Sequence, residues 1–125
     1  MDFKEMLQRA KKLYFDWPEE IPCKALKQNI RITRSGWDHL VNDRRRTRDQ
    51  IYFRAKHLAL ARKLIECVNI PQDISYEDRN QGRIYYWILQ GVIESKIIEV
   101  VIRQIGNQPK HFFSLVYKGG APRKK

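Results

Sequence analysis

Histidines and arginines are the residues of this sequence best suited to chemistry on a substrate. The three histidines are His39, His57 and His111, and none belongs to an HExxH motif or to a cluster with metal-ligand spacing. The glycine patterns GxxxxGK[ST], GxGxxG and GxSxG are also missing from the sequence. We therefore expect no metal site, no nucleotide cofactor and no serine nucleophile.

Metal-free RNA cleavage needs only the residue types that remain. In that reaction the 2′-hydroxyl attacks its own phosphodiester while a base takes its proton, and an acid protonates the leaving 5′-oxygen. Histidine suits either task because its ordinary pKa of about 6.5 is close to neutrality. Arginine suits the phosphorane because its planar fork donates to two oxygens at once.

His39 and Arg103 are the first candidates for such roles. His39 lies on a short predicted helix, two residues after Trp37 and just before a run of arginines. It is also compatible with a surface or half-buried structural histidine. Arg103 interrupts an apolar strand, where it could equally lie on an exposed face or point into a cleft.

The last predicted strand carries three further candidates, His111, Ser114 and Tyr117. Strict alternation puts Ser114 on one face with Phe112 and Val116. Tyr117 could donate to a phosphate or stack on a base. Each of these residues taken alone could equally have a structural role.

A run of basic residues is the best candidate for phosphate contacts, and it comprises Arg44, Arg45, Arg46 and Arg48. It precedes a predicted helix, where the positive end of the helix dipole disfavours cations. A bound polyanion explains such a placement, and a solvated basic face is the alternative. Tyr85, Tyr86 and Trp87 could form a stacking platform, with one or two of the three buried in the sheet.

The charge balance also indicates a polyanionic partner. Lys and Arg total 25 against 14 Asp and Glu, which gives a formal net charge of +11 and a sequence pI of about 9.9. Nucleic acid, an acidic membrane surface and an acidic protein all fit this excess.

Length and composition predict one folded domain, since 125 residues with 42% hydrophobic content can bury a core. Cys23 and Cys67 are expected to be two buried free thiols. No apolar run reaches the roughly 20 residues of a membrane-spanning helix. The acidic residues near the N-terminus are atypical of a secretory signal, so we expect a cytoplasmic protein without a membrane partner. A toxin delivered by another domain would look the same.

Helical periodicity of the apolar residues predicts mainly helices in the first half of the chain. Helices are expected over 3–14, from Ser35 to about 41, and over 49–68, with a linker at 16–24 and a strand at 29–33. The second half changes to β-branched and aromatic residues. Strands are expected over 83–90, 97–105 and 112–117, after a polar loop at 71–82. The predicted class is α+β, with helices on one face of an antiparallel sheet of about four strands.

Four segments carry a resemblance to a known family. The stretch Ile32-Thr33-Arg34-Ser35-Gly36-Trp37-Asp38-His39-Leu40 is followed by arginines and a long helix. Tyr85-Tyr86-Trp87-Ile88-Leu89, Val100-Val101-Ile102-Arg103 and His111-Phe112-Phe113-Ser114-Leu115-Val116-Tyr117 come later. Together they resemble the barnase–EndoU–colicin–RelE-like (BECR) nucleases, in particular the small branches associated with phages and mobile elements.

The resemblance covers roughly Asn29 to Lys118 and implies N-terminal helices followed by an antiparallel sheet. It implies metal-independent ribonuclease activity, often that of a toxin countered by an immunity protein or antitoxin, with RNA, possibly tRNA, as substrate. Carried over residue by residue, it makes His39, Arg103 and Ser114 catalytic, with Tyr117 as a weaker match. We count His111 and Lys118 among the nucleic-acid contacts.

On this basis the chain is divided into an N-terminal helix and linker (1–28), a nuclease or RNA-binding domain (29–118) and a basic flexible tail (119–125). The leading functional hypothesis is a metal-independent ribonuclease. The alternative is a protein of a mobile element that binds nucleic acid without cutting it. A third possibility is a protein-interaction module.

Overall fold

A single mixed sheet organises the molecule. The computed structural model describes residues 2–80 and 82–120. Within them the strands are β1 (Glu20–Cys23), β2 (Gln28–Arg31), β3 (Asp73–Arg79), β4 (Gly82–Ile93), β5 (Lys96–Ile105) and β6 (His111–Gly120). They lie in the order β1-β2-β6-β5-β4-β3, and all neighbours are antiparallel except β2 and β6, which pair in parallel. The α+β class is confirmed, whereas the prediction of about four antiparallel strands is wrong.

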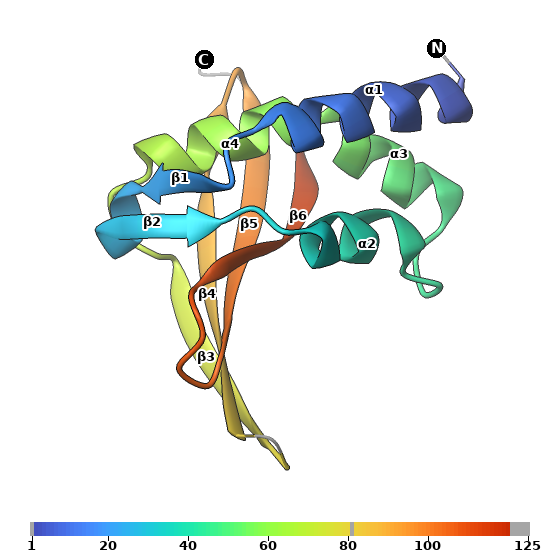
Figure 1. The fold of residues 1–125 in the computed structure, drawn as a ribbon. Helices are drawn as coiled ribbons and strands as arrows, with labels where there is room; N and C mark the ends of the chain where they lie inside the picture. Colours follow the sequence, from blue (N-terminus) through green and yellow to red (C-terminus); the bar gives the residue numbers. More distant parts are fainter. Residues whose placement is uncertain (1, 81, 121–125) are drawn as a thin grey trace.

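The helices gather at one end of this sheet (Figure 1). They are α1 (Phe3–Asp16), α2 (Arg34–Asn42), α3 (Arg48–Lys56) and α4 (Leu58–Cys67). Side chains fix where three of them begin. Asp2 accepts from Glu5 N at 2.8 Å, Thr33 accepts from Gly36 N, and Thr47 forms a capping box with Gln50. The N-cap of α2 is thus Thr33 and not Ser35.

Three predicted segments differ from the structure. The helix expected over 49–68 breaks at His57, which is buried and lies 2.6 Å from Phe53 O through Nδ1, so α3 and α4 are separate. The linker at 16–24 contains β1, and the loop at 71–82 contains β3. The strand β3 was missed because six of its seven residues are exposed and its alternation is limited to Ile74 and Tyr76.

Tyr14, near the C-terminal end of α1, places its side chain at the centre of the core. Its hydroxyl donates to Thr33 O at 2.5 Å, and its ring contacts Trp17, Trp37 and Phe112. Gly36 permits this packing. A Cβ at that position would lie 2.6 Å from Tyr14 Oη and 2.7 Å from Phe112 O. The first turn of α2 therefore rests directly on β6.

The far part of the sheet extends beyond the helices as an uncovered arm (Figure 1). We define the arm as residues 73–79, 82–87 and 103–105, and the body as the rest of the sheet with its helices. Strict pairing of β3, β4 and β5 gives the arm two faces. One carries Tyr86 and Arg103, and the other carries Tyr85 and Trp87.

Several other expectations can be compared with the structure. Cys23 is buried but Cys67 is exposed, so the prediction of two buried thiols is half wrong. Of the predicted tail, 119–120 end β6 and 121–125 lie outside the described residues. None of the helices described combines the length and apolar character that crossing a bilayer requires.

Candidate functional site: an arginine cleft

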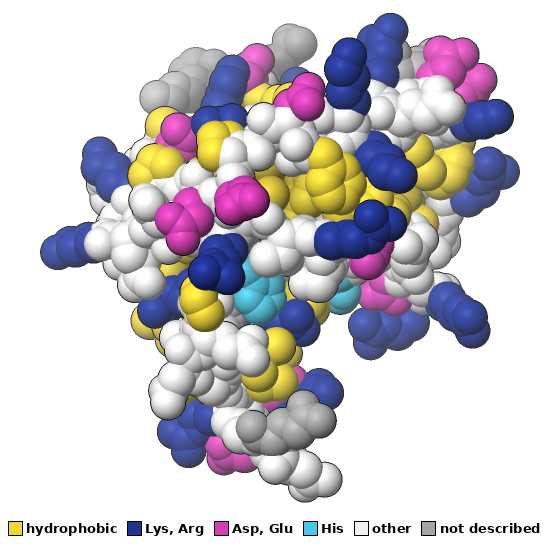
Figure 2. Space-filling view, viewed as in Figure 1, with side chains coloured by type: hydrophobic (Ala, Val, Ile, Leu, Met, Phe, Trp, Pro, Cys, Tyr) yellow, Lys and Arg dark blue, Asp and Glu magenta, His cyan; other side chains and the backbone are white. Residues whose placement is uncertain are grey.

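A cleft of about 530 Å³ opens where the arm meets the end of α2. Four arginines from three segments of the chain line it, namely Arg45, Arg46, Arg79 and Arg103. Asp43 and Glu77 are the carboxylates among its lining residues, so its formal charge is positive. Figure 2 shows histidine and basic side chains at this junction of body and arm. We call it the arginine cleft.

His39 enters the cleft from the last turn of α2. Its ring stacks on Phe113 with centroids 3.9 Å apart, and its Nε2 lies 3.1 Å from Arg46 Nη2. Because a guanidinium only donates, Nε2 accepts and the ring proton is on Nδ1. Burial, followed by the charge of Arg46, lowers the pKa of His39 to about 4. The imidazole is neutral at neutral pH.

Arg46 ties the cleft to the end of α2. It donates to the main-chain oxygens of His39 at 2.7 Å and Leu40 at 3.2 Å, which are carbonyls that a helix end leaves unpaired. It also donates to Ser114 Oγ at 3.0 Å. Its side chain is 11% exposed. A basic group at this end of a helix is favoured by the helix dipole.

A β-bulge in β6 decides where Ser114 points. Val101 pairs with Ser114, whereas Ile102 pairs with Phe112, so Phe113 is an extra residue. The expectation that Ser114 and Phe112 share a face is therefore wrong. Phe112 lies in the core, and Ser114 points toward the arginines.

Ser114 positions arginines and does not line the cleft. It is 4% exposed and accepts from Arg46 and from Arg54 Nη1 at 3.3 Å. Arg54 also donates to Leu115 O. Burial lowers the pKa of Arg54 to about 10, which leaves it charged at neutral pH. The sequence offered no sign of this role for Arg54, because it depends on a contact between α3 and β6.

Arg103 and His111 form a second arginine–histidine pair. Arg103 Nε donates to His111 Nε2 at 3.0 Å, and its guanidinium lies 4.1 Å from the centroid of Phe113. His111 is 7% exposed, and burial lowers its pKa. His39 and Arg103 therefore both contact the ring of Phe113, although 64 positions of sequence separate them.

The arm adds three residues to the cleft: Glu77 and Arg79, which the sequence did not single out, and Tyr86, which was expected only in a stacking platform. Tyr86 Oη donates to Glu77 Oε1 at 2.8 Å, and Arg79 Nη2 lies 2.8 Å from the same oxygen. The hydrogen bond from Tyr86 is the main cause that lowers the pKa of Glu77. Two of these residues lie in the segment expected to be a loop. Tyr86 could have been found from its register opposite Arg103.

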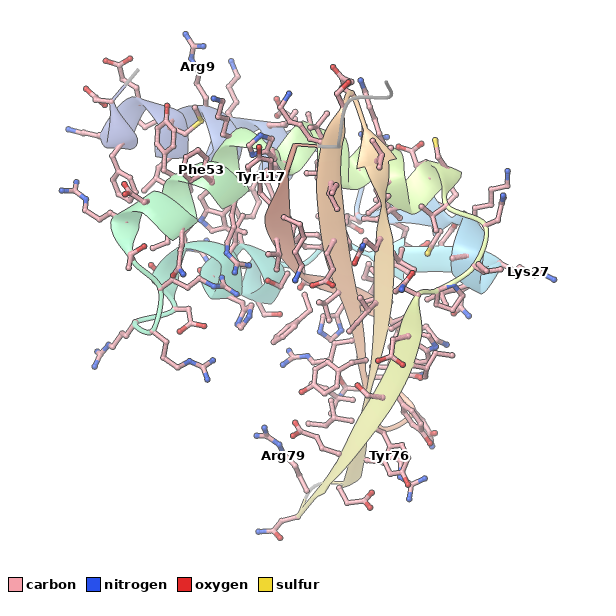
Figure 3. The ribbon with its side chains drawn as sticks, turned by 180° about the vertical axis from the view of Figure 1, so that it is seen from behind. Arg9, Lys27, Phe53, Tyr76, Arg79 and Tyr117 are labelled. Atoms are coloured by element: carbon pink, nitrogen blue, oxygen red, sulfur yellow. The ribbon has the colours of Figure 1, made fainter. Side chains whose placement is uncertain are left out.

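The remaining candidates lie elsewhere. Tyr117 stacks on His57 with centroids 4.2 Å apart, near the helices (Figure 3). Arg48 lies over the ring of Phe3, and Lys118 lies 3.8 Å from Glu99. Arg44 is exposed and is not among the residues that line the cleft.

The three aromatic residues expected to form a platform are divided between the faces of the arm. Tyr85 and Trp87 share one face, and Tyr86 lies on the other. All three are half-buried and Trp87 packs against the core, so the expectation that one or two would be buried is met only in part.

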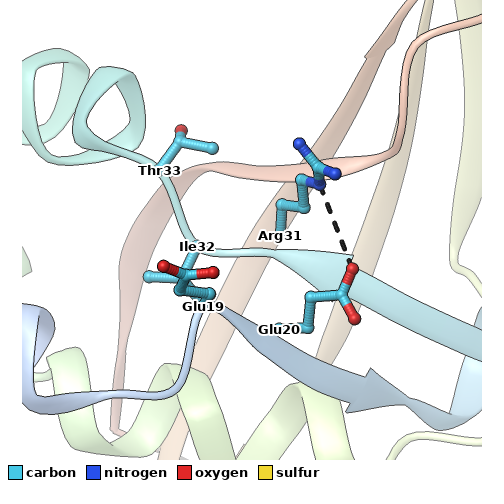
Figure 4. A pocket seen from close by; sticks show the side chains of 5 residues that line it. All are labelled: Glu19, Glu20, Arg31, Ile32 and Thr33. Carbon is cyan, nitrogen blue, oxygen red and sulfur yellow. Dashed lines mark ion pairs between the residues drawn. The ribbon is translucent and has the colours of Figure 1, made fainter.

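Another hollow lies beside β1 and β2 (Figure 4). Glu19, Glu20 and Arg31 contribute its charged side chains, with Arg31 Nε 4.0 Å from Glu20. Two carboxylates to one arginine make it a poor site for a polyanion. Among the described residues no three His, Cys, Asp or Glu side chains gather as metal ligands would.

Comparison with protein-family models, with curated proteins and with solved structures finds no match to this chain.

Proposed function

We propose that the protein is a metal-independent ribonuclease that holds an RNA phosphodiester in the arginine cleft. The observation that carries the proposal is the convergence of four arginines and a neutral histidine on one open cleft. Guanidinium groups bind phosphate oxygens through paired hydrogen bonds and stabilise the charge that develops on a phosphorane. The BECR-like resemblance and the net charge of +11 point to the same class of substrate.

In this reaction neutral His39 takes the proton of the 2′-hydroxyl. The 2′-oxygen bonds to phosphorus and the bond to the 5′-oxygen breaks. The 5′-oxygen takes a proton from a water molecule, which recovers one from protonated His39. His39 Nε2 becomes free when Arg46 turns from it to a phosphate oxygen. The phosphate charge favours that movement and also raises the pKa of His39 from about 4 toward its ordinary value. Ser114 positions Arg46, and Arg103 contacts the phosphate.

A specific observation favours a second candidate, a protein that binds nucleic acid without cutting it. The Nε2 atoms of both His39 and His111 accept hydrogen bonds from arginines. In that arrangement the imidazoles orient guanidinium groups and exchange no proton. Toxicity, with an immunity protein or antitoxin as partner, belongs to the first candidate only.

Two substitutions at one position separate the candidates. His39→Gln keeps an acceptor for Arg46 but cannot take a proton, whereas His39→Ala removes both functions. End-labelled tRNA and a mixed RNA are incubated with each protein in EDTA, and RNA affinity is measured in parallel. We expect the unmodified protein to cleave, and His39→Gln to bind normally without cleaving.

Salt-sensitive binding by every variant without any cleavage would support the second candidate and exclude the first. No RNA binding by the unmodified protein at low salt would exclude both, because phosphate contacts are strongest there.

A further inference from the structure

A row of three aromatic rings lies on the face of the arm opposite the arginine cleft. Tyr76 of β3 pairs directly with Tyr85 of β4, and their ring centroids are 6.1 Å apart. Trp87 follows Tyr85 on the same face at 5.8 Å, with an interplanar angle of 27°. We call these residues the aromatic row. Figure 3 shows Tyr76 and Arg79 on opposite sides of β3 near the tip of the arm.

The strands that carry the aromatic row extend beyond the helices (Figure 1), and the row runs from half-buried Trp87 and Tyr85 to exposed Tyr76. Tyr76 is 58% exposed, and Ile74 beside it is 56% exposed. On the same face of the sheet, within the body, Leu89 and Val100 are fully buried. The core of the protein accounts for Trp87, which packs against it at one end of the row, but it includes neither Tyr76 nor Tyr85. Contiguous exposed aromatic surface is typical of binding sites.

A cation lies at each end of the row. Lys110 Nζ is 4.9 Å from the centroid of Trp87, and the Arg83 guanidinium is 4.1 Å from that of Tyr76. Asp78 balances Arg83, since Arg83 Nε donates to it at 2.9 Å. Lys110 has a neutral partner, the Gln28 Oε1 atom at 3.4 Å, and no carboxylate within 4 Å among the described residues. The surface is therefore aromatic and net positive.

We infer that the aromatic row stacks unpaired bases of single-stranded nucleic acid. Stacked rings flanked by Lys and Arg are the combination that such proteins use, because every base has a face to stack and every nucleotide carries a negative phosphate. An apolar protein partner would cover Lys110 without neutralising it, which costs free energy. The inference rests on the proposed function for its choice of partner and predicts that the RNA is single-stranded.

The row and the arginine cleft lie back to back across the same strands. Tyr86, between Tyr85 and Trp87 in sequence, points into the cleft. The strand β3 is the edge of the sheet. An RNA that uses both sites passes over this edge, with its backbone in the cleft and its bases on the row. A rigid duplex cannot follow that path, whereas a flexible single strand can.

The test measures affinity for an oligouridine of about 12 nucleotides, within the span of known single-strand sites. The oligouridine carries 2′-O-methyl groups, which prevent cleavage. Its duplex with the complementary strand and an oligothymidine of equal length are measured beside it. The variants are Tyr85→Ala and Tyr76→Ala, with Phe15→Ala as a matched control, since Phe15 is 45% exposed but lies on α1.

We expect Tyr85→Ala to bind the single strand about tenfold more weakly, with duplex affinity and Phe15→Ala unchanged. Equal loss for oligothymidine identifies single strands of either sugar as ligands, and loss for oligouridine alone identifies RNA. The single strand should also quench tryptophan fluorescence. That signal reports Trp87, because Trp17 and Trp37 are 7% and 5% exposed.

Unchanged single-strand affinity in both Tyr85→Ala and Tyr76→Ala overturns the inference. Tyr76 lies on the edge strand and is largely exposed, so its substitution tests the row even if Tyr85→Ala does not fold. The variant Arg103→Ala tests the arginine cleft, and so distinguishes a failure of the aromatic row from a failure of the proposed function. Weaker binding of single strand and duplex by that variant alone supports the cleft and excludes the row.

Discussion

The body and the arm share strands but obey different physical constraints. Ile74, Trp87 and Ile102 lie in one register across β3, β4 and β5, on the same face of the sheet. Ile102 is fully buried, whereas Ile74 is 56% exposed. Two isoleucines on strands that only β4 separates thus mark the boundary between a surface that stabilises the fold and a surface that is free to bind.

The difference shows how this protein can combine stability with an open site. Burial in the body provides the free energy that keeps the sheet together. The arm contributes hydrogen bonds and paired charges, and its side chains remain accessible. Arg79 and Tyr86 can therefore serve the cleft, and Tyr76 and Tyr85 the aromatic row, with little cost to folding.

The largest expected effect tests this boundary directly. Ile102→Ala should lower the free energy of unfolding by about 2–5 kcal/mol, because it removes fully buried methyl groups and leaves a cavity. Ile74→Ala should change it by less than about 0.5 kcal/mol, as exposed substitutions do. Urea denaturation measures both. A similar cost for the two variants would mean that something covers the arm in solution.

Two neighbouring arginines sharpen the comparison at the cleft itself. Arg46→Ala should lower the free energy of unfolding by about 2 kcal/mol, because the carbonyls at the end of α2 and the hydroxyl of Ser114 lose a hydrogen-bond donor. Arg45→Ala should leave stability unchanged, because its side chain is 86% exposed. Urea denaturation and RNA affinity across a salt series are the measurements.

Both arginines line the cleft, so each substitution should weaken RNA binding, and Arg45→Ala should reduce the salt slope by about one. Undiminished RNA affinity in Arg45→Ala would place the phosphates outside this cleft.

Local sequence patterns were enough to predict most of the helices and strands that form the body. Helical spacing located α1 and α2, and β-branched runs located β4, β5 and β6. The same patterns singled out His39 and Arg103, which the structure brings into one cleft. A histidine before an arginine run and an arginine in an apolar strand are unusual enough to be noticed without any structure.

The arm and the finer geometry of the cleft could not be predicted in this way. β3 is almost entirely exposed, and its short alternation of Ile74 and Tyr76 with polar residues ends in Asp78, so the apolar pattern was too weak to indicate the strand that pairs with β4. The bulge at Phe113 moves Ser114 to the other face of the sheet, and the sequence of β6 alone does not predict it. Arg54 and Arg79 reach the site through contacts between segments that are distant in sequence.

The smallest expected effect concerns pH and the neutral histidine of the cleft. The pKa of His39 is about 4 in the folded protein and about 6.5 in the unfolded chain. Between these pH values His39 is protonated in the unfolded chain and neutral in the folded protein. The stability present above pH 6.5 is therefore lost as the pH falls. The loss at pH 5 should be about 1–2 kcal/mol, after allowance for partial solvation.

His39→Gln tests this assignment because glutamine keeps an acceptor for Arg46 and does not titrate. At pH 7 the variant should be somewhat less stable, since it loses the stacking on Phe113. At pH 5 its deficit should shrink or reverse, because only the unmodified protein pays the protonation penalty there. His57 and His111, whose pKa values burial also lowers, titrate in both proteins and cancel from the difference. A deficit that is constant from pH 7 to pH 5 would mean that His39 titrates normally and that the cleft is wetter than its geometry indicates.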